Sequence, residues 1–226
     1  MKHVGTTYIQ LSTHGSPLAN PTLAAELAEA GLDAVKIPLY GPIAEIHEGV
    51  IQTKGSFSRA TAALRNCGDL GVHVFVNSLV VRQNCCHLID LFNVALEYTD
   101  WQNIAFSVPF IVDDAIESFY IPLRSLQPYV LPLVTYGATR GRFARFHEIP
   151  MCVFGTPYPY CSKGGPPDLG LQQPPLSVRS QVKDVPTYRL KKKVEMCVHC
   201  TQRSNCDGFV VNDVDRYGTG TLVPFS

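Results

Sequence analysis

Apolar runs alternate with helix-like stripes along the first half of the chain, and this alternation limits the possible folds more than any other feature. Four short apolar runs predict buried strands, at residues 8–12, 34–40, 72–81 and 104–112. Three segments between them have apolar side chains at helical spacing, at residues 20–31, 57–67 and 84–95. Units of roughly 30 to 35 residues with this alternation are typical of βαβ crossovers. The sequence therefore predicts an α/β fold with a parallel sheet and helices on its faces.

The second half of the chain is less regular. Residues 114–126 and 133–146 are expected to be helical, the second segment in spite of Gly137 and Gly141. Proline and glycine crowd residues 155–188 and periodicity is weak there, which predicts an irregular segment. We place a domain boundary near residue 150, so that residues 1–148 form the α/β domain and residues 149–226 an irregular, cysteine-rich extension.

Composition and missing motifs exclude several classes of protein. Lys plus Arg and Asp plus Glu number 19 each, so no overall field favours nucleic acid. The sequence has neither an apolar stretch of membrane-spanning length nor an N-terminal export signal, so we expect a cytoplasmic protein without a membrane partner. Eight cysteines in such a protein are expected to be thiols or metal ligands rather than disulfides. The common nucleotide-binding and hydrolase motifs are absent.

Three cysteines near the C-terminus form a C-x2-C-x5-C run, and they are the strongest chemical signal in the chain. They are Cys197, Cys200 and Cys206, and Gly208 follows two positions later. Thiolates at this spacing can hold one metal centre, either a zinc ion or an iron–sulfur cluster. The sequence therefore predicts a metal site, and the spacing leaves zinc and iron–sulfur open.

A fourth ligand must come from another part of the chain. Cys152, in the stretch Ile-Pro-Met-Cys at residues 149–152, is the first candidate. Cys161 is the next candidate, and His199, inside the C-x2-C turn, is the third.

Four other residues could bind a metal or act in catalysis by their chemistry, but we expect them to have only structural roles. Cys85 and Cys86 stand at the start of a predicted helix, where adjacent side chains point in different directions, so we do not expect them to bind a metal. Cys67 shares an apolar stripe with the preceding helix and is expected in the core. His47 is expected in an exposed turn between the second strand and the next helix.

Polar residues follow or interrupt two of the predicted strands. In parallel α/β sheets the carboxyl ends of the strands line the ligand site, which makes the turn of Thr13, His14 and Gly15 a candidate. A turn whose glycine takes a positive φ is the simpler explanation. Asn77 and Ser78 must point to opposite faces of their strand, so a ligand explains at most one of them. A hydrogen bond within the fold is the alternative explanation.

Four stretches, in their order along the chain, resemble a radical S-adenosylmethionine (radical SAM) enzyme with a SPASM or twitch C-terminal extension. They are a strand and turn at residues 11–15 with an Ala-Gly-Leu-Asp segment at 30–33, a strand at 35–41 with His47 and a helix start at 54–57, a strand at 74–84, and the cysteines of residues 149–152 and 197–206. The resemblance covers most of the chain, and only its last stretch is specific.

The resemblance implies a partial (β/α) barrel whose first strand here corresponds to the family's third. It implies one auxiliary 4Fe–4S cluster bound by Cys152 and the C-x2-C-x5-C run, because Val210 stands where the SPASM pattern has a further cysteine. It also implies that Thr13, Gly15 and Asn77 line the S-adenosylmethionine cleft.

The departures from the family pattern bear on activity. The C-x3-C-x2-C loop, which holds the cluster that cleaves S-adenosylmethionine, and the Gly-Gly-Glu-Pro strand are absent from the sequence. His14 and Pro38 stand where the family often has asparagine and serine. The resemblance thus implies that the chain is a truncated or split member of the family. Enzymes of this family modify peptides or small cofactor precursors with a 5′-deoxyadenosyl radical. A second chain or a missing N-terminal segment would supply the first cluster. The alternative is a non-catalytic metal-binding module, with zinc or iron–sulfur, that binds a protein partner.

Overall fold

The computed structural model describes residues 7–161 and 190–226, which form two compact units. Unit 1 comprises Met1–Ser107 and Pro132–Arg145, and unit 2 comprises Val108–Leu131 and Phe146–Ser226. Residues 108–131 thus belong to the same compact unit as the C-terminal cysteines, which the sequence patterns did not indicate. No helix in the described part of the chain is long and apolar enough to cross a membrane.

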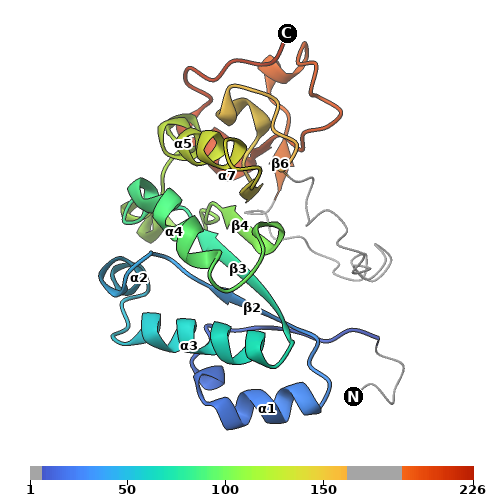
Figure 1. Cartoon of the computed structure of the whole chain (residues 1–226). Coiled ribbons are helices and arrows are strands. Elements are labelled where there is room, and N and C mark those ends of the chain that lie inside the picture. Colours follow the sequence, from blue (N-terminus) through green and yellow to red (C-terminus); the bar gives the residue numbers. More distant parts are fainter. Residues whose placement is uncertain (1–6, 162–189) are drawn as a thin grey trace. The chain divides into compact units, whose positions relative to one another are not determined.

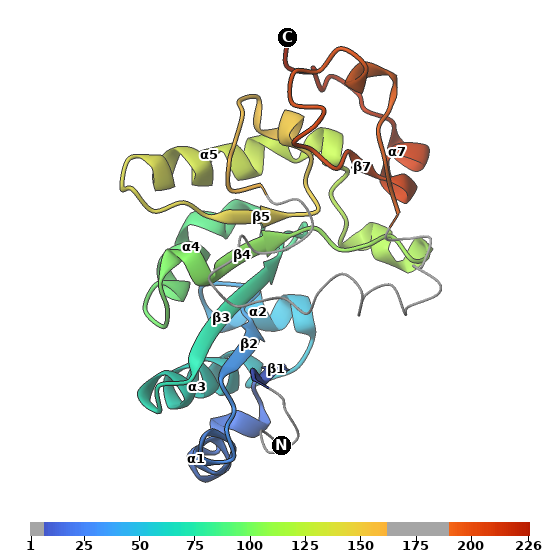
Figure 2. The ribbon, with the colours of Figure 1, turned by 90° about the vertical axis from the view of Figure 1, so that its right-hand side faces the viewer.

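Unit 1 is built on parallel strands that follow one another in sequence order, each connected to the next through helix (Figure 2). The strands are β1 (Gln10–Ser12), β2 (Ala34–Pro38), β3 (His73–Leu79) and β4 (Ile104–Ser107). The helices between them are α1 (Pro21–Glu29), α2 (Ala44–Ile51), α3 (Ser56–Asp69) and α4 (Leu88–Ala95). The predicted α/β fold with a parallel sheet is confirmed.

Two elements cross the division between the units, and both differ from the prediction. A single helix, α5 (Gln127–Ala138), replaces the two expected between residues 114 and 146, and it includes Pro132. Residues Asp114–Ser118 form only a short 3-10 helix, η5. Residues Arg145–His147 form a strand, β5. The positive φ of Gly141 favours a turn before this strand rather than a continued helix.

The first helix begins where the sequence predicts. The side chain of Asn20 accepts a hydrogen bond from the backbone N–H of Thr22 at 3.0 Å, and Pro21 occupies the first helical position, where no N–H is needed. Helices α1 and α3 pack against one another on one side of the unit (Figure 1). The turn after β1 packs against this helical layer, because a Cβ on Gly15 would lie 3.2 Å from both Ala63 and Ile37.

The two faces of the sheet differ in how deeply their side chains are buried. In β3 the side chains of Val74, Val76 and Ser78 are buried, whereas Phe75, Asn77 and Leu79 are half-buried. Asn77 and Ser78 therefore point to opposite faces, as predicted. The Ser78 hydroxyl donates a hydrogen bond to the carbonyl of Leu39, so a bond within the fold explains this polar residue without a ligand.

His47 lies on α2 and is 1% exposed, so the expectation of an exposed turn is wrong. Its Nδ1 accepts a hydrogen bond from the backbone N–H of Tyr40 at 3.1 Å, and its ring lies 5.6 Å from that of Phe57. Strand β2 ends at Pro38, so the next backbone donors need acceptors outside the sheet. The neutral imidazole supplies one.

This burial predicts a loss of stability in mild acid. Burial lowers the pKa of His47 to about 4, against a weaker opposing effect of Glu48. The unfolded chain therefore binds a proton at higher pH than the folded one, and the contribution of His47 is complete above its unfolded pKa and lost as pH falls toward 4. We expect the free energy of unfolding, measured by urea titration, to fall by about 2 kcal/mol more between pH 7 and pH 5 than in His47→Asn.

The variant His47→Asn is the matched control, because the amide oxygen it introduces can still accept from the N–H of Tyr40 but does not titrate. Equal pH slopes for the native chain and His47→Asn would contradict the prediction.

Unit 2 has its own core. The rings of Phe146, Phe154 and Tyr158 lie within 5.0 to 5.9 Å of one another. The buried carboxylate of Asp213 accepts hydrogen bonds from the Tyr120 hydroxyl at 2.6 Å and the backbone N–H of Leu123 at 3.1 Å. These bonds connect helix α7 (Val211–Tyr217) to the segment at residues 120–123. Strands β6 (Lys191–Lys192) and β7 (Phe209–Val210) pair in antiparallel beside the cysteine run.

Candidate metal centre

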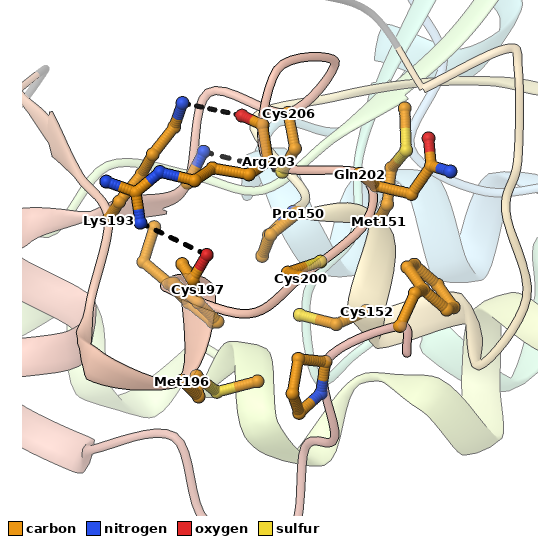
Figure 3. Close-up of a pocket in the computed structure, with 14 residues that line it drawn as sticks. Pro150, Met151, Cys152, Lys193, Met196, Cys197, Cys200, Gln202, Arg203 and Cys206 are labelled. Carbon is orange, nitrogen blue, oxygen red and sulfur yellow. Dashed lines mark hydrogen bonds between the residues drawn. The ribbon is translucent and has the colours of Figure 1, made fainter.

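Four cysteines of unit 2 line a single hollow (Figure 3). They come from separate stretches of the chain. Cys152 lies on the 3-10 helix η7 (Met151–Phe154), Cys197 ends the 3-10 helix η9 (Glu195–Cys197), Cys200 follows in the next turn, and Cys206 precedes β7. Met196 and Phe225 are among the side chains that complete the wall of the hollow.

Backbone hydrogen bonds fix the two ends of the C-x2-C turn. The N–H of Cys197 donates to Val194 at 2.9 Å, and the N–H of Cys200 donates to the carbonyl of Cys197 at 3.3 Å. The guanidinium of Arg203 donates to the same Cys197 carbonyl at 3.2 Å, and the Lys193 ammonium donates to the carbonyl of Arg203 at 2.6 Å (Figure 3). Two cationic side chains therefore brace the turn that carries two of the thiols.

Gly208 positions the third cysteine of the run. Its backbone N–H donates to the Cys206 sulfur at 3.4 Å, within the range for a sulfur acceptor. Its φ is +89°, and a Cβ there would lie 2.3 Å from the carbonyl oxygen of Lys192 on the paired strand. Only glycine fits this close approach of two backbones.

The thiol of Cys152 lies within electrostatic reach of the other three. Burial and the thiols of the C-x2-C-x5-C run raise the pKa of Cys152 to about 12. A positive centre in the hollow would reverse this effect, because metal ligation deprotonates a thiol.

The other candidate ligands lie elsewhere. The buried Cys161 thiol donates to the carbonyl of Ile149 at 2.7 Å and lines a smaller, adjacent hollow together with Cys206. Burial is the main cause that raises its pKa to about 12. His199 is exposed and lines neither hollow.

In the described residues, no group of three or more His, Cys, Asp or Glu side chains is arranged to hold one metal ion. The smaller hollow has a charged edge, where the Lys191 ammonium lies 2.8 Å from the Glu148 carboxylate and 3.5 Å from that of Asp207.

The residues expected in a cofactor cleft of unit 1 are not all brought together. The hydroxyl of Thr13 accepts a hydrogen bond from the N–H of Gly15 at 3.2 Å, so it is engaged within its own turn. Gly15 packs on the helical layer together with Ile37. Asn77 pairs in register with Pro38, next to Ile37 in β2, and so lies on the opposite face of the sheet.

The thiols of Cys85 and Cys86 also differ from the prediction. The sulfurs of Cys85 and Cys86 lie 3.9 Å apart, so the expectation that they point in different directions is wrong. The two residues begin a 3-10 helix, η3 (Cys85–His87), instead of an α-helix.

Fold and site together define an α/β protein of parallel strands with a hollow lined by four cysteines. No protein-family model matches the sequence, and no curated protein matches it. Among solved structures the chain is similar to anSMEcpe. The structure of native anSMEcpe with bound AdoMet and the Kp18Cys peptide is 14% identical with a TM-score of 0.47, and the match covers 62% of this chain and 40% of that one. The structure with the Cp18Cys peptide is 15% identical with a TM-score of 0.47, and the match covers 61% and 40%. The chain thus spans about two fifths of the length of these proteins.

Proposed function

We propose that unit 2 binds an auxiliary 4Fe–4S cluster through Cys152, Cys197, Cys200 and Cys206. The observation that carries this proposal is the presence of all four thiols around one hollow, although Cys152 is far from the others in sequence. Four cysteine thiolates are the usual ligand set of a 4Fe–4S cluster. The donor set therefore fits the cluster that the sequence resemblance implies.

The sequence resemblance favours a cluster over a single zinc ion, and the arrangement of the thiols is compatible with that choice. Each sulfur of a tetrahedral zinc site lies about 2.3 Å from the same point, so the sulfurs crowd together. No three potential ligands in the described residues meet this condition. In a cluster each cysteine binds its own iron atom, which allows the sulfurs to lie farther apart. The N–H of Gly208, directed at the Cys206 sulfur, is the kind of hydrogen bond that tunes the reduction potential of a cluster.

For unit 1 we propose the role of a radical SAM-like barrel. Of the three residues that the resemblance implies for its cofactor cleft, we keep Asn77, because it lies on the face of the sheet opposite Gly15 and its helical layer. The support is the parallel α/β sheet and the order of the resembling sequence stretches. In the family, a reduced cluster cleaves S-adenosylmethionine to a radical that modifies a peptide or a small precursor. Residues 1–226 contain no C-x3-C-x2-C run, so this step requires a cluster from a preceding segment or a second chain.

A second candidate function is a non-catalytic metal-binding module that binds a protein partner. The observation that favours it is the free edge of β1. In the described residues β1 pairs with β2 alone, and all three of its residues are exposed. A strand edge of this kind can accept a further strand.

Anaerobic reconstitution of the purified chain with iron and sulfide tests these proposals. We expect a brown protein with about four iron atoms per chain and broad absorption near about 400 nm. Addition of a reductant and S-adenosylmethionine is expected to yield no 5′-deoxyadenosine from this chain alone.

A colourless protein that takes up zinc in preference to iron would overturn the cluster. Rapid formation of 5′-deoxyadenosine by the chain alone would overturn the requirement for another source of the first cluster.

A further inference from the structure

Cys85 and Cys86 form a thiol pair in unit 1 that the proposed function does not use. Their sulfurs lie 3.9 Å apart in the loop between β3 and α4, beyond the carboxyl end of β3. Cys86 is exposed to solvent, whereas Cys85 is buried and directs its sulfur at the carbonyl of Arg82 at 3.5 Å. A reagent can therefore reach one thiol of the pair directly and the second through the first.

Asn84 holds the loop that carries the pair. Its side chain is fully buried and makes three hydrogen bonds. Its Oδ1 accepts from the N–H of Val81 at 2.9 Å, and its Nδ2 donates to the carbonyls of Tyr40 at 2.9 Å and Leu79 at 2.8 Å. Because a buried side chain with all these bonds does not rotate freely, the backbone of the loop that carries the two thiols is held in place before any ligand arrives.

The distance between the Cys85 and Cys86 sulfurs is better suited to the binding of one atom by both sulfurs than to a disulfide between them. A disulfide requires the sulfurs to close to about 2.05 Å and normally joins Cα atoms about 4.4 to 6.8 Å apart. Adjacent residues have Cα atoms only about 3.8 Å apart, so a disulfide here would be strained. By contrast, two sulfurs bonded to one shared atom stay more than about 3 Å apart, so the pair at 3.9 Å needs far less movement to share an atom than to close a disulfide.

The pair offers only two protein ligands. In the part of the chain that the structure describes, no third His, Cys, Asp or Glu completes a metal site. An ion that requires four protein ligands would be held weakly there. The pair fits a ligand whose central atom already carries one substituent and needs only two thiols to complete its bonds.

We propose that Cys85 and Cys86 form a two-thiol site that captures soft, thiophilic electrophiles such as a monosubstituted trivalent arsenical. The exposed Cys86 thiol attacks the arsenic first, and the Cys85 thiol follows. Two S–As bonds form and the As–O bond breaks, the oxygen leaves as water with the two thiol protons, and arsenic stays trivalent. Burial and the neighbouring Cys86 thiol raise the pKa of Cys85 to about 11, which keeps the second thiol protonated until the first bond brings the electrophile beside it.

Phenylarsine oxide is the probe that tests this site. The tryptic peptide of residues 83–124 contains these two cysteines and no other, so mass spectrometry assigns the adduct directly. On the full-length chain we expect one phenylarsenic group per peptide, resistant to excess glutathione and removed by 2,3-dimercaptopropanol. Cys86→Ala changes an exposed side chain. Its affinity for phenylarsine oxide at residues 83–124 should fall by at least about 100-fold, because only one thiol remains there and the second, intramolecular S–As bond cannot form.

Cys67→Ala is the matched control, since it removes a lone buried thiol of the same unit and should leave the adduct unchanged. An adduct that glutathione removes, or one that Cys86→Ala retains, would overturn the proposal. Recovery of a Cys85–Cys86 disulfide in place of the adduct would also overturn it.

Discussion

Replacement of Cys152, Cys197, Cys200 or Cys206 by alanine is expected to lower the 4Fe–4S content of the reconstituted chain at least about tenfold. Each of these thiols lines the same hollow, and a missing ligand leaves one iron atom of the cluster without its thiolate. Iron and sulfide analysis, together with absorption near about 400 nm, measures the loss.

Cys161→Ala is the control for this series. Cys161 is a buried thiol of unit 2 that lies near Cys206, but it lines the adjacent hollow and donates its hydrogen to the carbonyl of Ile149. We expect this variant to keep its cluster. If Cys161→Ala loses the cluster and Cys152→Ala keeps it, Cys161 is the fourth ligand and our assignment is wrong.

The second large effect is expected for Gly208→Ala. The new Cβ would lie 2.3 Å from the Lys192 carbonyl oxygen, a backbone atom that cannot rotate away, and alanine disfavours the positive φ. Relief of this overlap requires β6 and β7 to separate at the pairing of Lys192 with Phe209. It also withdraws the N–H that Gly208 directs at Cys206. We expect a loss of about 2 to 5 kcal/mol in the free energy of unfolding of unit 2 and a matching loss of bound iron.

Gly71→Ala is the control that separates the effect of the steric overlap at Gly208 from the effect of the positive φ alone. Gly71 has a φ of +74°, but a Cβ there meets nothing within 4 Å. This control should cost about 1 kcal/mol and leave the iron content unchanged. Urea unfolding and iron analysis of both variants make the comparison, and equal iron contents would contradict the role we give to Gly208.

The fold of unit 1 was predictable because its signals are local. Asn20 and Pro21 mark the start of α1, and the apolar runs mark the strands, since a capping side chain or a buried run acts within its own segment. The bounds of the later helix were misjudged. Pro132 lies inside α5, where the helix continues without one backbone donor.

The site was only partly predictable, because its geometry depends on contacts between distant segments. The spacing of Cys197, Cys200 and Cys206 was sufficient to predict one turn of ligands. The choice between Cys152 and Cys161 depends on the path of the chain through Gly155, which takes a left-handed conformation just after Cys152. No local pattern indicates that path.

The buried place of His47 and the pairing of Cys85 with Cys86 were missed for the same reason. His47 is an acceptor for a backbone donor seven residues earlier, and the thiol pair is held by Asn84 through the carbonyl of Tyr40, 44 positions away. One signal was present in the sequence: residues 44–51 have apolar side chains at helical spacing, which places His47 on a short helix.

The order in which the ribosome makes the four proposed ligands has a consequence for cluster assembly. Cys152 is synthesised 54 residues before Cys206. At about 5 to 20 residues per second, roughly 3 to 11 seconds pass before the last ligand exists. During that interval the nascent chain carries an incomplete set of thiols that an oxidant can reach. Under the proposed ligand set, the cluster must therefore be delivered to a chain whose synthesis has already passed residue 206.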